Sequence, residues 1–258
     1  MKIIVTSDFH GTKEIMAPLN SLMDNEKPDV VVFCGDIVKG YARGNEWLSS
    51  KKLGRKPDKE KKEIKNEEKE DLELYDYFYK NIRKNAPVLV VPGNMDAPEE
   101  RYFSGILNLN MKNLYPLHEQ MFFKEKYVFA GFGGEITKDK EEKFFVLRYQ
   151  KEKVRGLVER IKKVNKEKIL VFHSPPVCKV GKEGEVVVGS DAVNEIIHEI
   201  KPKLLFCGHA HKAAGTDTVG DTLCVNPGPL KYRNAVIMDS EKMDVRFVKL
   251  SLEMGLNR

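Results

Sequence analysis

The feature that most constrains the fold of this chain is a repeated pairing of an apolar run with a polar motif. Short apolar runs occur at residues 3–5, 30–33, 88–91, 169–172 and 204–206, all but the last rich in β-branched residues, and polar residues follow each run. Runs of this length and composition are typical of buried strands. Because α/β proteins build ligand sites where the carboxyl ends of strands meet, we expect these polar motifs to converge.

The polar motifs carry side chains that can bind metal ions. They are Asp8-Phe9-His10, Gly35-Asp36, Gly93-Asn94-Met95-Asp96, His173-Ser174-Pro175-Pro176 and Gly208-His209-Ala210-His211. His209 and His211 lie one residue apart at the end of a strand and point to different sides, so they could serve two neighbouring ions. A single His-x-His pair also occurs in ordinary polar loops, but the other motifs supply the remaining ligands of such a site.

The periodicity of the rest of the chain predicts helices that cover sheets. Apolar residues recur at helical spacing over residues 15–23, 72–82, 154–164 and 192–200, whereas residues 127–130, 222–225, 235–239 and 245–250 are predicted to be strands. Short strands are also expected between residues 101 and 135. Strand–helix alternation implies parallel strands, and the hairpins that follow indicate sheets packed on one another and covered by helices.

A charged segment interrupts this order. Residues 43–71 are rich in Lys and Glu and contain almost no apolar residues apart from Trp47, Leu48, Leu53 and Ile64. One interpretation is a solvated excursion, partly helical through Glu–Lys pairs or partly disordered. The other is a lid or partner-binding arm, since the segment follows the Asp36 motif. We expect a single domain over residues 1–258 with this insertion, because the proposed ligands are spread along the chain and must converge.

Composition limits the partners and the location that we expect. The formal net charge is +5, from 44 Lys and Arg against 39 Asp and Glu, and the two signs are interspersed, which does not indicate a nucleic-acid binder. No apolar stretch approaches the roughly 20 residues of a membrane span, and the first strand begins close to Met1, so we expect a cytoplasmic protein. Abundant Lys and Glu with little Gln also suggests a thermophilic source.

In order along the chain, Asp8-x-His10, Gly35-Asp36, Gly93-Asn94, His173 and Gly208-His209-x-His211 resemble the motif set of the calcineurin-like metallophosphoesterases. The resemblance spans almost the whole chain. Residues 226–230 (Asn-Pro-Gly-Pro-Leu) and 189–191 (Gly-Ser-Asp) make it most similar to the prokaryotic Icc-related predicted phosphoesterases. The resemblance implies an α/β (α+β) fold, a four-layer αββα sandwich of two mixed sheets flanked by helices.

The resemblance also implies a centre of two divalent or trivalent metal ions. Asp8, His10 and His211 would hold one ion, Asn94, His173 and His209 would hold the other, and Asp36 would bridge them. Carboxylate and imidazole ligands suit Mn, Fe, Zn or Ni, of which we favour Mn, and the absence of thiolates argues against a structural zinc site. Two ions about 3.5–4 Å apart lower the pKa of a bound water, so a bridging hydroxide is the expected nucleophile.

One residue departs from the resemblance. Many relatives have a histidine where this chain has Met95, and the family uses that histidine to stabilise phosphate charge and protonate the leaving group. Methionine offers neither a proton nor a charge. General acid catalysis is typically worth about 10²–10⁴-fold, so its loss predicts a slow enzyme that favours good leaving groups.

Other polar residues near the motifs have alternative interpretations. Asp96 either orients a neighbouring ligand or caps a turn or helix. His118 is either a substitute proton donor or an ordinary surface residue, and His198 falls within a helix and is expected to be structural or exposed. We expect Lys212 and Lys231, which flank metal motifs, to be solvated rather than to contact phosphate.

The sequence therefore predicts a metal-dependent hydrolase of small-molecule phosphate esters, with Asp36, Asn94 and Asp96 as its catalytic residues. We expect phosphodiesters to be preferred over phosphomonoesters, because the single charge of a diester suits a site with few protons. A nuclease is a second hypothesis, although no basic stripe with interleaved aromatic residues supports it. A third is a binding scaffold that keeps the fold without turnover. The retained metal ligands oppose it, because clustered carboxylates without a cation repel one another.

Overall fold

The computed structural model describes residues 1–107 and 111–251. Its first sheet contains β1 (Lys2–Thr6), β2 (Val30–Phe33), β3 (Val88–Val90), β4 (Leu114–Pro116), β15 (Asn234–Asp239) and β16 (Asp244–Lys249). The strand order is β16-β15-β1-β2-β3-β4. Strands β1 to β4 are parallel, and β15 and β16 form an antiparallel hairpin beside β1. The sheet is therefore mixed.

The second sheet is built in a similar way. It contains β5 (Met121–Lys124), β6 (Tyr127–Phe132), β9 (Glu167–Phe172), β12 (Leu204–Phe206), β13 (Gly215–Val219) and β14 (Thr222–Asn226). In the order β13-β14-β12-β9-β6-β5, the inner four strands are parallel and the two edge strands are antiparallel to their neighbours. Two small sheets lie outside it, formed by β7 (Glu135–Thr137) with β8 (Arg148–Gln150) and by β10 (Lys182–Glu183) with β11 (Val186–Val187).

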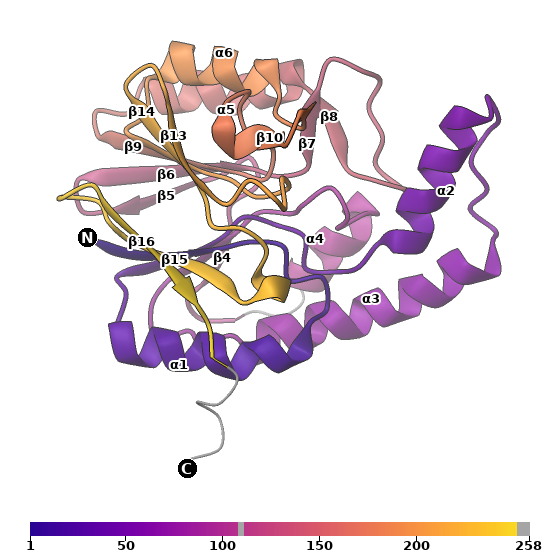
Figure 1. Cartoon of the computed structure of the whole chain (residues 1–258), viewed down its shortest axis with the longest axis horizontal. Helices are drawn as coiled ribbons and strands as arrows, with labels where there is room; N and C mark the ends of the chain where they lie inside the picture. Colours follow the sequence, from indigo (N-terminus) through magenta and orange to yellow (C-terminus); the bar gives the residue numbers. More distant parts are fainter. Residues whose placement is uncertain (108–110, 252–258) are drawn as a thin grey trace.

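Helices cover the outer face of each large sheet. The helices are α1 (Met16–Glu26), α2 (Tyr41–Lys52), α3 (Lys62–Asn81), α4 (Glu99–Leu107), α5 (Lys151–Lys162) and α6 (Asp191–Ile200), with 3₁₀ turns η1 (Lys13–Ile15), η2 (Lys179–Gly181) and η3 (Leu230–Tyr232). In Figure 1, α1 and α3 lie below the two sheets, and α5 and α6 lie above them. The predicted four-layer αββα sandwich is confirmed. Among the described residues, no helix is long and apolar enough to cross a membrane.

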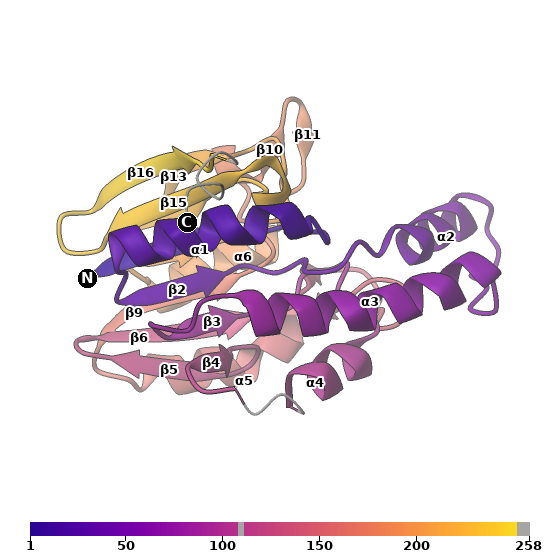
Figure 2. The same ribbon diagram turned by 90° about the horizontal axis from the view of Figure 1, so that it is seen from below.

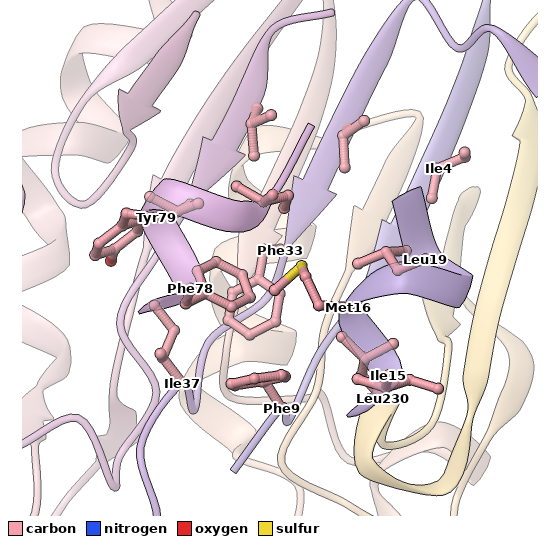
Figure 3. Close-up of a cluster of buried hydrophobic side chains, with 14 of the residues drawn as sticks. Ile4, Phe9, Ile15, Met16, Leu19, Phe33, Ile37, Phe78, Tyr79 and Leu230 are labelled. Atoms are coloured by element: carbon pink, nitrogen blue, oxygen red, sulfur yellow. The ribbon is translucent and has the colours of Figure 1, made fainter. Parts of the chain in front are cut away.

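Alternation along β1 shows why the strands are continuously apolar. Ile3 and Val5 point into the core between the two sheets, whereas Ile4 points into the core beneath α1 and α3. When both faces of a strand are covered, the side chains on both faces are buried, so consecutive positions are apolar. Figure 3 shows the outer core, where the ring of Phe78 on α3 lies 5.2 Å from that of Phe9 and 4.7 Å from that of Phe33.

The charged segment at residues 43–71 is largely helical. Figures 1 and 2 both show α2 and the first turns of α3 projecting beyond the sheets, on the side of the carboxyl ends of the strands. Arg43 of α2 is completely buried, and its Nη1 lies 2.6 Å from Asp71 Oδ2 and 3.2 Å from Glu67 Oε2 on α3. These ion pairs hold the two helices together, so α3 begins at Lys62, about ten residues before its apolar periodicity begins.

The strands expected between residues 101 and 135 are β4, β5 and β6, and an unpredicted helix precedes them. Arg101 and Tyr102 lie in α4, and the ring of Tyr102 is buried against that of Tyr75 on α3. Residues 108–110 of this stretch lie outside the described residues. The strand β13 was not predicted, because its side chains alternate between exposed and half-buried and only Val219 is buried.

Candidate metal centre

The sheets bring all of the predicted ligands to one edge of the molecule. Asp8 and His10 follow β1, Asp36 follows β2 and Asn94 follows β3, and these three strands are neighbours in the first sheet. His173 follows β9, and His209 and His211 follow β12, its neighbour in the second sheet. Because the parallel strands of both sheets end on the same side, side chains more than 200 residues apart come into contact.

The first group of predicted ligands consists of Asp8, His10 and His211. The Nε2 atom of His211 lies 3.2 Å from Asp8 Oδ1 and 3.3 Å from His10 Nε2. Together with Asp36, these residues offer ligand atoms that all lie within 4.8 Å of one another. This spacing suits a single cation at their centre.

The second group consists of Asn94, His173 and His209. The Oδ1 atom of Asn94 lies 2.9 Å from His173 Nε2 and 3.0 Å from His209 Nδ1. Asp36 lies between the groups, with its Oδ2 atom 3.7 Å from His10 Nε2 and 3.6 Å from His173 Nε2. The arrangement therefore has two clusters of donors that share one carboxylate.

The backbone around Asp36 orients the histidines on both sides. The Nδ1 atom of His173 donates to the carbonyl of Cys34 over 2.7 Å, and that of His10 donates to the carbonyl of Val38 over 3.0 Å. A carbonyl can only accept, so each ring carries its proton on Nδ1 and directs an Nε2 lone pair toward Asp36. Burial lowers the pKa of His10 to about 4 and that of His173 to about 3, which keeps both rings neutral.

This donor set fits a cation. The Nε2 lone pair of His173 faces the amide oxygen of Asn94 and the carboxylate of Asp36, which are acceptors as well. Burial and the charges of Asp8 and Asp96 raise the pKa of Asp36. Burial also opposes ionisation of Asp8, but its hydrogen bond with His211 keeps its pKa below the usual range. Where His173, Asn94 and Asp36 meet, acceptor atoms converge without a donor between them, and a positive ion stabilises such an arrangement.

Four of the predicted ligand residues have strained backbones. Asp8, His10, Asp36 and His209 adopt φ values of 57°, 45°, 64° and 69°, in the left-handed region that non-glycine residues avoid. Each such residue costs roughly 1–3 kcal/mol and persists only where its surroundings impose it, which is common at functional sites. A neighbouring glycine makes room: a Cβ atom on Gly208 would lie 1.8 Å from Ser7 Oγ and 2.9 Å from Asp8 Oδ2.

Asp96 is buried behind the ligands and holds the loops that carry them. Its carboxylate accepts the backbone N–H groups of Asp36, Ile37, Val38 and Gly93 at 2.7–3.2 Å, as well as the hydroxyl of Tyr75. It thus orients the Asp36 segment, and the helix α4 begins further on, at Glu99. Burial raises the pKa of Asp96 to about 6, although the four N–H donors stabilise its charged form.

Met95 links the site to the charged arm, which consists of α2 and the first turns of α3. Its N–H donates to Asp36 Oδ1 over 2.7 Å, and its carbonyl accepts from Arg43 Nη2 over 3.3 Å. Its side chain packs on α2, where a Cβ atom on Gly44 would lie 2.9 Å from its Cε. The position expected to carry a general acid therefore holds an apolar contact between the arm and the metal loops.

The remaining histidines lie in different environments. His118 is buried among aromatic rings, its Nδ1 accepts the N–H of Gly133 over 2.9 Å, and its ring centroid lies 4.5 Å from that of Phe132. Burial lowers the pKa of His118 to about 4. These contacts fit a residue of the core rather than a plain surface residue. His198 on α6 is exposed, as expected.

Sequence reasoning missed one residue beside the site and misjudged the burial of another. The phenol ring of Tyr41, the first residue of α2, stacks beside His10 with ring centroids 6.0 Å apart. Lys231, expected to be solvated, is half-buried in η3, and its N–H donates to the carbonyl of Asp8 over 3.1 Å. Lys212 is exposed, as expected. Tyr41 could not be found from the sequence, because the arm reaches the site only through the fold.

An αββα sandwich with imidazole and carboxylate side chains gathered at the strand ends defines the metallophosphoesterase type of protein. Residues 1–250 match the family described as metallophosphoesterase, calcineurin superfamily. The chain belongs to this superfamily. Its members hydrolyse phosphoesters with divalent metal ions, and Asp8, His10, Asp36 and His211 form a candidate group for holding such an ion.

Relatives agree with this membership. An uncharacterized protein of Methanocaldococcus jannaschii is 28% identical over 253 residues, which cover 93% of this chain and 96% of that protein. One crystal structure, 26% identical, has a TM-score of 0.88 and covers 97% of this chain and 99% of its own chain. A dimetal phosphatase from Danio rerio, 11% identical, shares the fold with a TM-score of 0.58, covering 97% of this chain and 99% of that chain.

The hydrogen bonds of Asp96 generate the first prediction. Replacing Asp96→Asn turns one acceptor oxygen into a donor facing backbone N–H groups, so we expect a loss of about 1–3 kcal/mol in the free energy of unfolding. We also expect Mn²⁺ to bind roughly 10–100-fold more weakly, because Asp36 and its neighbouring carbonyls lose their support. Denaturant titration and calorimetry measure the two effects. The exposed Asp76→Asn is the matched control, and unchanged Mn²⁺ affinity in Asp96→Asn would contradict the assignment.

The buried His118 generates a prediction on pH. Its pKa is lower in the folded protein than the ordinary value of about 6.5, so the unfolded chain binds more protons between the two values. Its stabilising contribution is therefore complete above about pH 6.5 and is lost as the pH falls toward 4. Between pH 7.5 and 4.5, we expect metal-free wild type to lose about 2–3 kcal/mol more stability than His118→Gln.

Denaturant unfolding across this pH range measures the difference, and the shared contribution of the metal-site residues cancels between the two proteins. The exposed His198→Gln should follow wild type. A parallel decline of wild type and His118→Gln would show that His118 is not held neutral.

Proposed function

We propose that this protein is a metal-dependent phosphoesterase with two metal ions, and that it hydrolyses phosphodiesters in preference to monoesters. The observation that supports this best is the position of Asp36, whose Oδ2 atom lies 3.7 and 3.6 Å from the inward Nε2 atoms of two neutral histidines. A carboxylate that lies between the Nε2 lone pairs of two histidines is suited to bridging two cations. The shared fold with a dimetal phosphatase is consistent with this proposal.

The two groups of donors suggest the ligand assignment. Asp8, His10 and His211 would hold one ion, Asn94, His173 and His209 would hold the other, and Asp36 would be common to both. Nitrogen and oxygen donors suit Mn, Fe, Zn or Ni, and we favour Mn. Such a pair of ions supplies a water of lowered pKa and neutralises charge on the phosphate. In this proposal Asp36 and Asn94 contribute to catalysis by holding the ions. Asp96 is a positioning residue that orients the Asp36 segment.

The residues around the ions decide the preferred ester. Met95 cannot protonate a departing alkoxide, so leaving groups that are stable as anions should react fastest. Lys231 adds a positive charge beside Asp8, which favours binding of an anionic ester. If Lys231 protonated the leaving group, it would lose this charge. A diester with a low-pKa leaving group is the substrate that makes the smallest demand for an acid.

Two other functions remain as alternatives. A non-catalytic scaffold would keep the metal-binding geometry but show no turnover, and Met95 favours it slightly. A nuclease would require a surface that follows a nucleic-acid backbone, and the interspersed charges of the chain do not favour one. The assay below separates the three functions.

Hydrolysis by metal-stripped protein, with and without Mn²⁺, tests the proposal. We expect Mn²⁺-dependent release of nitrophenolate from bis(nitrophenyl) phosphate, slower release from nitrophenyl phosphate, and a loss of both in Asp36→Asn, because this variant removes the shared charge. The exposed Asp76→Asn should behave as wild type. Tight Mn²⁺ binding without turnover of either ester would favour the scaffold, and hydrolysis confined to polynucleotides would favour the nuclease.

Met95 generates a separate prediction. Introducing an acid with Met95→His should restore part of the roughly 10²–10⁴-fold contribution of general acid catalysis, mainly for esters with poor leaving groups. Plotting log kcat against leaving-group pKa should then give a shallower slope than in wild type. Met95→Leu, which keeps an apolar contact with α2 and has no proton, is the control. An unchanged slope in Met95→His would mean that the missing acid does not limit the reaction.

A further inference from the structure

One buried guanidinium group joins the charged arm to the loops that carry the predicted metal ligands. Arg43 is completely buried in the first turn of α2. Its Nη1 atom lies 2.6 Å from Asp71 Oδ2 and 3.2 Å from Glu67 Oε2. Its Nη2 atom donates to the carbonyl of Met95 over 3.3 Å. The planar fork of arginine can bind carboxylates and a carbonyl at the same time, each from a separate nitrogen.

Neighbouring groups fix the position of this guanidinium. The carboxylate of Glu67 accepts the N–H groups of Ala42 and Arg43 over 2.7 and 3.0 Å, so α3 holds the N-terminal end of α2. The Nη1 atom of Arg101 on α4 lies 3.5 Å from Asp71 Oδ2. Arg43 is therefore held in a framework of three helices and does not behave as a flexible surface side chain.

Met95 connects Arg43 to the shared carboxylate. The N–H of Met95 donates to Asp36 Oδ1 over 2.7 Å, and its carbonyl, in the next peptide unit, accepts from Arg43. Two glycines let α2 approach closely, since a Cβ atom on Gly40 would lie 2.8 Å from the carbonyl oxygen of Met95 and one on Gly44 would lie 2.9 Å from its Cε. The other oxygen of the Asp36 carboxylate faces the two buried histidines.

We infer that Arg43 is a positioning residue of the metal centre, which fixes the orientation of the Asp36 carboxylate through Met95. This inference rests on the proposed function, because that carboxylate is the group that the two ions would share. Docking of the charged arm and metal binding are then coupled. Undocking of the arm weakens metal binding, and bound metal stabilises the docked arm by the same factor. Neither the solvated excursion nor the lid considered for this segment includes such a role.

Calorimetric titration of metal-stripped Arg43→Lys with Mn²⁺ tests the inference. Lysine keeps a positive charge beside Asp71 and Glu67 but lacks the second nitrogen of the fork, so the hydrogen bond to Met95 is lost. Groups that hydrogen-bond to a metal ligand typically change metal affinity about 10–100-fold, and because Arg43 acts through Met95 we expect a loss of about tenfold. Arg101→Lys is the matched control. It alters the same cluster of ion pairs but leaves the hydrogen bond to Met95 in place, so it should bind Mn²⁺ as wild type does.

Hydrogen exchange measures the same coupling from the side of the arm. In wild type, saturating Mn²⁺ should slow the exchange of α2 amides about tenfold, the factor by which undocking weakens metal binding. In Arg43→Lys the rates with and without Mn²⁺ should be nearly equal. Arg101→Lys can exchange faster overall, but Mn²⁺ should slow it by the same factor as wild type. A merely structural role of Arg43 would change the rates and leave this factor unaltered.

A second variant separates the contact with Met95 from the effect of unpaired buried carboxylates. Arg43→Met combined with Asp71→Asn removes one buried charge of each sign together with the hydrogen bond to Met95. Removing both partners avoids the cost of leaving one buried charge unpaired. We expect this double variant to bind Mn²⁺ about as weakly as Arg43→Lys.

The outcomes distinguish this inference from the proposed function. If Arg43→Lys or the double variant binds Mn²⁺ as tightly as wild type, or if Mn²⁺ does not slow α2 exchange in wild type, Arg43 does not position the centre and the phosphoesterase stands. An equal loss of affinity in Arg101→Lys would assign the effect to the ion pairs and would also overturn the inference. If wild type binds no Mn²⁺, the proposed function fails as well.

Discussion

The candidate metal centre depends on the short backbone segment that follows β2. The carbonyls of Cys34 and Val38 orient His173 and His10, and the side chain of Asp36 lies between those two rings. Asp96 accepts three consecutive N–H groups of this segment and one from Gly93. One buried carboxylate thus fixes the segment that positions Asp36 and orients two histidine rings, so a small shift of the segment would disturb all three side chains.

The fold tolerates considerable strain and buried charge to build this geometry. Asp8, Asp36 and Asp96 are almost completely buried, and several ligand residues have left-handed backbones. Neither feature is stable by itself, because buried carboxylates repel one another and a left-handed residue costs free energy. The two covered sheets and their three cores supply the surrounding rigidity, and bound cations would remove most of the repulsion.

The charged arm contributes to the site as well as to the surface. Its buried Arg43 joins Glu67 and Asp71 of α3 to the carbonyl of Met95, and its first residue is Tyr41. Buried ion pairs add little net stability but fix the relative positions of the groups they join. The arm therefore sets the position of Met95, and it places an aromatic ring beside His10 that the sandwich alone would lack.

The buried strands that end at the polar motifs, and the order of those motifs, could be predicted from the sequence, because apolar runs and the residues at their ends are local signals. The sequence did not reveal α4, the stacking of Tyr41 on His10 or the partial burial of Lys231, and it left the first half of α3 open between helix and disorder. The tertiary structure decided these, together with the nitrogen that each histidine directs inward. The physical reason is that the partners involved, such as His173 with Cys34 or Lys231 with Asp8, are far apart in the chain, and only the packed sheets bring them together.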